Sequence, residues 1–192
     1  MNNKIKNNLK IIEKNVESLQ NTKFEYLIVN ASKIIINSLK KKNKILFCGN
    51  GGSAADAQHL SAELSGQYLK NRQALAAVDL SSNSSLLTSV ANDISFDEVF
   101  SRQISAIGLR GDVLFAITTS GKSKNILNGI KIAKKMGLKV ILLTSEKANK
   151  LKKIVDLFIP SPGNRVDRIQ ETHIIIGHLI CELVEENLSK NK

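Results

Sequence analysis

Short apolar runs alternate with stretches of helical periodicity from residue 45 onward, and this alternation constrains the fold more than any other feature of the chain. Strands that alternate with helices are joined by right-handed crossovers and pair in parallel, and buried parallel strands are apolar on both faces. The expected strands are 45–48, 75–78, 113–117, 140–143 and 155–159. The sequence therefore predicts an α/β core over residues 45–188, built on a five-stranded parallel sheet.

Residues 1–44 contain no Gly or Pro, and their apolar residues recur at helical spacing, first from Ile5 to Leu19 and then from Leu27 to Leu39. We predict two long amphipathic helices that form a hairpin packed on the core. So much apolar stripe before the first strand indicates that these helices also join subunits. With 192 residues and no linker-like segment, the chain is expected to be a single domain, residues 1–192.

The net charge of +11 comes from 28 basic residues, of which only five are Arg. The lysines are spread along the chain, and six Phe with two Tyr leave little for stacking on bases. We therefore expect a solvated basic surface and no nucleic-acid partner. No apolar run approaches the roughly 18 residues of a membrane span, so we expect no membrane partner either.

The two cysteines, Cys48 and Cys181, belong to no Cys-x-x-Cys pattern, so neither a disulfide framework nor a zinc knuckle is indicated. The N-terminal residues have no apolar stretch that could act as a secretory signal. A cytoplasmic location is the expectation.

A glycine-rich loop, Gly49-Asn50-Gly51-Gly52-Ser53, follows the first expected strand and opens a helix. Glycines permit tight turns and close backbone approach, and a helix N-terminus offers unpaired N–H groups to an anion. The loop matches neither the dinucleotide-binding pattern nor a Walker loop, so nucleotide binding is not favoured.

A hydroxyl-rich loop, Thr118 to Ser123, follows the third expected strand and also precedes a helix. Its four hydroxyls, its glycine and the helix-terminal N–H groups suit a phosphate monoester without a metal. The alternative is a helix cap made by Ser123, which is common in proteins.

Two pairs of polar residues could share a ligand. His59 and Glu63 are four residues apart, so both project from one helix face, although a solvated His–Glu pair has the same spacing. Gln170 and His178 are eight residues apart, about 80° around a helix and about 12 Å along it, which is weak evidence by itself. His173 lies on another side of that helix, and we interpret it as a packing residue or a local hydrogen-bonding group.

Taken together, these motifs resemble the sugar-isomerase (SIS) domain family, and within it the sedoheptulose 7-phosphate isomerases. The matching segments follow the family's order from about residue 45 to 185. They are Gly49 to His59, Glu63, Ala91 to Asp93, Phe100 to Gln103, Thr119 to Ser123, Asp167 to Glu171, Gly177 and His178.

The resemblance implies a three-layer αβα SIS fold, a homotetramer with active sites near subunit interfaces, and one Zn²⁺ per subunit. Carried over by position, the zinc ligands are His59, Glu63, Gln170 and His178. The substrate-binding positions are Asn50, Gly51, Gly52, Ser53, Glu63, Asn92, Asp93, Thr118, Thr119, Ser120, Ser123 and Gln170. Two departures from the family pattern stand out: Lys122 within the serine loop, and a segment at 145–150 without the usual Asp-Gly-Gly turn.

The implied reaction converts sedoheptulose 7-phosphate, a phosphorylated heptose, to D-glycero-D-manno-heptose 7-phosphate for lipopolysaccharide or capsule. Moving a carbonyl between two carbons requires a base for the carbon-bound proton and an acid for the oxygen. The resemblance assigns Glu63 as the base and His178 as the acid, with zinc available to polarise the carbonyl.

Two alternatives remain open at this point. One is a non-catalytic SIS protein similar to the DnaA initiator-associating factor, which lacks the acidic residue at the position of Glu63 and the His at the position of His178. The other is an isomerase for a different sugar phosphate, such as arabinose 5-phosphate, but those enzymes usually carry additional domains. The presence of both residues and the chain length favour the heptose isomerase.

Overall fold

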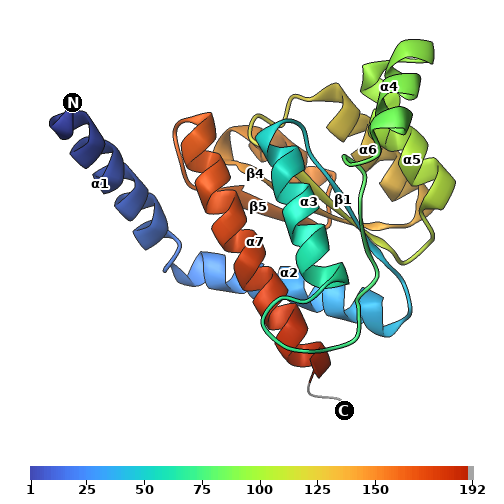
Figure 1. Cartoon of the computed structure of the whole chain (residues 1–192), viewed down its shortest axis with the longest axis horizontal. Coiled ribbons are helices and arrows are strands. Elements are labelled where there is room, and N and C mark those ends of the chain that lie inside the picture. The colour runs from blue at the N-terminus through green and yellow to red at the C-terminus, as the bar shows by residue number, and fades with distance from the viewer. Residues whose placement is uncertain (190–192) are drawn as a thin grey trace.

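The computed structural model describes residues 1–189, and within them one parallel sheet lies between two layers of helices (Figure 1). The strands are β1 (Ile45–Cys48), β2 (Ala77–Asp79), β3 (Val113–Thr118), β4 (Lys139–Ser145) and β5 (Leu157–Ser161). Their order in the sheet is β2-β1-β3-β4-β5, and every neighbouring pair is parallel. The predicted α/β class with five parallel strands is confirmed.

Seven α-helices occur within residues 1–189, together with 3-10 helices at Phe96–Glu98 and Glu146–Lys153. They are α1 (Asn2–Ser18), α2 (Thr22–Lys40), α3 (Gly52–Ser65), α4 (Ser84–Asp93), α5 (Val99–Ile107), α6 (Lys124–Met136) and α7 (Val166–Ser189). Apolar residues of α2, α3 and α7 pack on one face of the sheet, and those of α4, α5 and α6 pack on the other. None of these helices has the length and apolar character needed to cross a membrane.

Strands β2 and β5 both start two residues later than predicted. Before β5, the Asp156 carboxylate accepts the Val140 N–H at 2.9 Å, so this residue anchors the start of β4 through its side chain. Before β2, the Leu75 N–H donates to the Leu64 carbonyl at 3.1 Å, which ties this segment to the end of α3. Strand β5 continues through Pro160 because it lies at the edge of the sheet, where a missing N–H breaks no ladder.

The hairpin predicted for residues 1–44 is not seen, because α1 extends away from the body of the protein (Figure 1). In α1, which the structure describes completely, no side chain is buried. Ile5 and Leu9 are 60% and 58% exposed. The Asn21 side chain accepts the Lys23 N–H at 2.9 Å and caps α2, so the chain starts a new helix directly after the short turn that ends α1. The apolar stripe of α1 is therefore left uncovered within one chain.

Candidate active site

The glycine-rich loop connects β1 to α3, and each of its glycines has a structural reason. Gly51 has φ of +56°, a conformation that other residues rarely adopt. A Cβ atom at Gly49 would collide with the carbonyl of Ser53, and one at Gly52 would collide with the side-chain amide of Gln170. The glycines thus allow a sharp turn into α3 and bring Gln170 of α7 against the loop.

The glycine-rich loop and the serine loop line one cavity of about 360 Å³ at the carboxyl ends of β1 and β3. Its lining includes most of the predicted substrate-binding positions: Asn50, Gly51, Gly52, Ser53, Thr118, Thr119, Ser120, Ser123 and Gln170. Ser123 precedes α6, but its hydroxyl makes no capping bond to that helix within the described structure. The hydroxyl is therefore available to a ligand beside the positive end of the α6 dipole.

The segment at 145–150, which departs from the family pattern, packs against the serine loop. It forms the 3-10 helix 146–153, and its Ala148 packs so closely that any side chain at Gly121 would collide with it. The Ser145 hydroxyl donates to the Thr119 carbonyl at 2.7 Å. Lys122 is exposed. The different sequence of this segment thus leaves the serine loop well supported.

A pair of side-chain amides joins the glycine-rich loop to α6. The sequence analysis did not identify one of the two residues, Asn125. The Asn50 amide donates to Asn125, and the Asn125 amide donates back to Asn50, both at 2.9 Å. Asn125 is buried in the first turn of α6. The Asn50 side chain therefore holds the glycine-rich loop against the helix that follows the serine loop.

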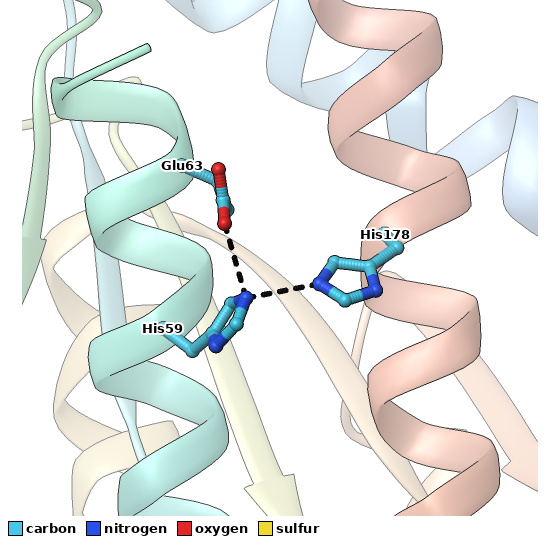
Figure 2. A group of neighbouring side chains, drawn as sticks. All are labelled: His59, Glu63 and His178. Carbon is cyan, nitrogen blue, oxygen red and sulfur yellow. Dashed lines mark hydrogen bonds and ion pairs between the residues drawn. The ribbon is translucent and has the colours of Figure 1, made fainter. Parts of the chain in front are cut away.

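His59, Glu63 and His178 meet between α3 and α7 (Figure 2). The Nε2 atom of His59 lies 3.0 Å from Nε2 of His178 and 3.0 Å from a carboxylate oxygen of Glu63. One ligand atom from each of the three residues lies within 4.8 Å of the others. The His59–Glu63 pair and His178, one member of the second weak pair, are thus parts of one group in the structure.

Ordinary two-centre hydrogen bonds cannot satisfy both contacts of His59 Nε2 at the same time. If His59 Nε2 carries a proton and donates it to Glu63, it has no lone pair left to accept from His178. If His59 Nε2 is unprotonated, its lone pair faces the Glu63 carboxylate without a proton between them. A cation at the centre satisfies all three donor atoms at once, so the group has the chemistry of a metal site.

The short distance between α3 and α7 depends on Gly177, which immediately precedes His178. A Cβ atom at Gly177 would lie 2.6 Å from both methyl carbons of Leu60 on α3. Figure 1 shows the two helices side by side along the same face of the sheet. The missing side chain lets α7 approach α3 closely enough for His178 to reach His59.

Comparisons with known proteins identify the family of this chain. The SIS domain family model matches residues 9–145. Phosphoheptose isomerase of Rhodospirillum rubrum is 50% identical over 161 residues, covering 84% of this chain and 86% of that protein. The Aliarcobacter butzleri enzyme of the same name is 43% identical over 178 residues, covering 93% and 92%. The solved structure of phosphoheptose isomerase from Neisseria gonorrhoeae has a TM-score of 0.83 and 37% identity, with 95% of each chain covered. The chain belongs to the phosphoheptose isomerases of the SIS domain family.

Membership in the phosphoheptose isomerase family confirms the SIS fold and the phosphosugar isomerase class that the motifs implied. The non-catalytic SIS alternative is not favoured, because the chain carries Glu63 and His178 and the structure places both in one group.

Not all predicted site residues of this SIS domain meet in one place. Gln170 lines the loop cavity and touches Gly52, whereas the other three expected metal ligands form the group between α3 and α7. Asn92 and Asp93 are exposed at the end of α4, outside the residues that line the loop cavity, and the Asn92 amide donates to Asp93 at 2.8 Å. Their role in substrate binding stays a prediction.

The pKa values of Asp56 on α3 and His173 on α7 are shifted by burial. Burial raises the pKa of Asp56, one turn before His59 on α3, to about 6, while the nearby His59 opposes the shift. Burial lowers the pKa of His173 to about 4, so this fully buried imidazole is neutral at pH 7. A neutral, enclosed ring agrees with the packing role predicted for His173.

Proposed function

We propose that this protein interconverts sedoheptulose 7-phosphate and D-glycero-D-manno-heptose 7-phosphate through an enediol intermediate, supplying heptose for surface glycans such as lipopolysaccharide or capsule. One observation carries the proposal: a carboxylate and two imidazoles converge between α3 and α7, and the N-terminal residues of both helices line a cavity bordered by hydroxyls. The names of the relatives in the family comparison support the same substrate.

The loops and the group between α3 and α7 would have different roles: phosphate binding and proton transfer. The serine loop and the α6 N-terminus would hold the phosphate, because hydroxyl and backbone N–H donors bind a dianion strongly. The Glu63 carboxylate would take the proton from the carbon next to the carbonyl, and the His178 imidazole would exchange a proton with the sugar oxygen. Closely placed donors around that oxygen would stabilise the charge that develops on it.

We also propose one Zn²⁺ per subunit, held by His59, Glu63 and His178, with Gln170 as the fourth ligand expected from the family. Imidazole nitrogens and carboxylate oxygens are donors that bind Zn²⁺ in proteins, so these residue types fit the ion. The donor atoms of Glu63 and His178 each lie 3.0 Å from His59 Nε2, close enough for the three residues to share one ion. When bound, zinc would supply Lewis-acid polarisation of the substrate carbonyl.

The proposed assembly is a homotetramer in the cytoplasm. The uncovered apolar stripe of α1 supports association, and the position of Asn92 and Asp93 outside their own chain's cavity agrees with active sites near subunit interfaces. Cys48 and Cys181 are free and buried, as suits a reducing compartment. Light scattering that shows a stable monomer at micromolar concentration would contradict the assembly.

Incubation with sedoheptulose 7-phosphate tests the reaction directly. We expect NMR to show signals of an aldose phosphate that grow to an equilibrium ratio. Removal of metal with a chelator should slow their growth, and added Zn²⁺ should restore it. If the ketose phosphate remains unchanged with the zinc-loaded protein, the proposed reaction is wrong.

For the serine loop, we expect Ser120→Ala combined with Ser123→Ala to raise KM for the phosphorylated sugar by tenfold or more. Each hydroxyl would donate a charge-assisted hydrogen bond to the phosphate, worth about 1.5–3 kcal/mol. Steady-state kinetics measures the effect. Ser105→Ala is the control, since its hydroxyl donates to the Ser101 carbonyl within α5, away from the loop cavity. An unchanged KM in the double variant would leave the loop with a structural role alone.

A further inference from the structure

An aromatic ring from outside both helices packs on His178. Tyr68, in the segment between α3 and β2, stacks on the imidazole with ring centroids 5.8 Å apart and an interplanar angle of 23°. The His178 ring thus has a flat neighbour that restricts its rotation.

A buried carboxylate holds the segment that carries this tyrosine. The backbone N–H groups of Tyr68, Leu69 and Lys70 donate to the two oxygens of Glu185 at 3.2, 2.8 and 3.0 Å. The Glu185 side chain is only 1% exposed. It lies seven residues after His178, which is two turns along the same face of α7. The helix that carries the imidazole therefore also anchors the ring that stacks on it.

Arg72 connects this anchor to the helix that carries the carboxylate of the site. Its Nε donates to Glu185 at 3.0 Å, and its side chain is 4% exposed. Its Nη2 donates to the Glu63 carbonyl at 2.7 Å, and its Nη1 donates to the Leu64 carbonyl at 2.9 Å. One guanidinium thus fixes the end of α3 relative to α7 at the residue that faces the two histidines.

We propose that Tyr68, Arg72 and Glu185 are positioning residues for the catalytic pair. Arg72 and Glu185 hold the segment 66–76 and the end of α3, and the Tyr68 ring keeps the His178 imidazole facing His59 and Glu63. The inference rests on the proposed function, because it concerns the geometry of that site. A stacked aromatic pair favours one ring orientation by roughly 2- to 13-fold. The effect on turnover should have that size.

The test compares Tyr68→Leu with Tyr68→Phe. We expect Tyr68→Leu to lower kcat about tenfold, to leave KM within about twofold, and to weaken Zn²⁺ binding several-fold in competition with a chromophoric chelator. Tyr68→Phe keeps the ring, so it should retain both wild-type values. Tyr26→Leu is the control, because Tyr26 is the other tyrosine of the chain and is 68% exposed on α2. Thermal melts of each variant verify folding.

The outcomes separate the two proposals. Wild-type kcat and zinc affinity in Tyr68→Leu would overturn the positioning role, as would equal losses in the Phe and Leu variants. A wild-type protein that binds zinc but does not isomerise the sugar phosphate would overturn the proposed function alone, and zinc affinity would still test the positioning role. A wild-type protein that does neither would overturn both.

Discussion

Glu63→Gln is expected to lower kcat by at least 10²-fold, the loss typical when a general base is removed. Glutamine keeps the size of the side chain and one oxygen that can bind a metal, but it cannot accept the proton from carbon. Turnover of sedoheptulose 7-phosphate followed by NMR measures the effect. In D₂O the wild-type reaction should place deuterium at the carbon next to the carbonyl, since an enediol exchanges with solvent, and the variant should lose this label.

Substrate binding provides the control for this experiment. The glycine-rich loop and the serine loop, which would bind the phosphate, line a cavity that does not include Glu63, so the sugar phosphate should still raise the melting temperature of the variant. Glu25→Gln makes the same chemical change at an exposed position on α2 and should leave kcat unaltered. A Glu63→Gln protein with normal metal content and near wild-type turnover would remove Glu63 from the role of base.

Glu185→Ala is expected to lower the free energy of unfolding by about 3–5 kcal/mol, because it leaves the Arg72 guanidinium buried without its counter-charge. Three backbone N–H groups lose their acceptor as well. Urea denaturation measures the difference.

The next residue offers a matched comparison. Glu186 is 44% exposed, and its oxygen lies 3.8 Å from Lys70 Nζ, so Glu186→Ala should cost at most about 1 kcal/mol. The double variant Arg72→Ala with Glu185→Ala should lose less than the sum of the two single variants, since the pair acts as a unit. Equal denaturation midpoints for the Glu185 and Glu186 variants would contradict the role of the buried pair.

Most of the sheet could be predicted from the sequence because parallel strands must be apolar on both faces, and such runs are visible in the chain. The predicted limits of β2 and β5 were wrong by two residues at their starts, where neighbouring segments are held by other hydrogen bonds than those of the sheet. Asp156 uses its carboxylate to bond β4, and Pro160 is tolerated because β5 lies at an edge. The course of α1 could not be predicted, because helical periodicity shows which face is apolar but not what covers it.

The candidate site was predictable where its residues belong to one loop or one helix. The glycine-rich loop and the serine loop could be found from the residue types next to strands, and His59 with Glu63 from helical spacing. The approach of His178 depends on Gly177 fitting against Leu60, a contact between distant parts of the chain. The Arg72–Glu185 pair spans 113 residues, and the Asn50–Asn125 pair spans 75, so neither leaves a local signal.

The uncovered stripe on α1 has a consequence for every comparison of stability. If further copies of the chain cover Ile5 and Leu9, each folded chain gains free energy only when copies meet, and mass action makes that gain grow with protein concentration. Dilution alone would then lower the melting temperature without any change in sequence. Variants should therefore be compared at one concentration, and a dilution series would measure how much of the stability belongs to the assembly.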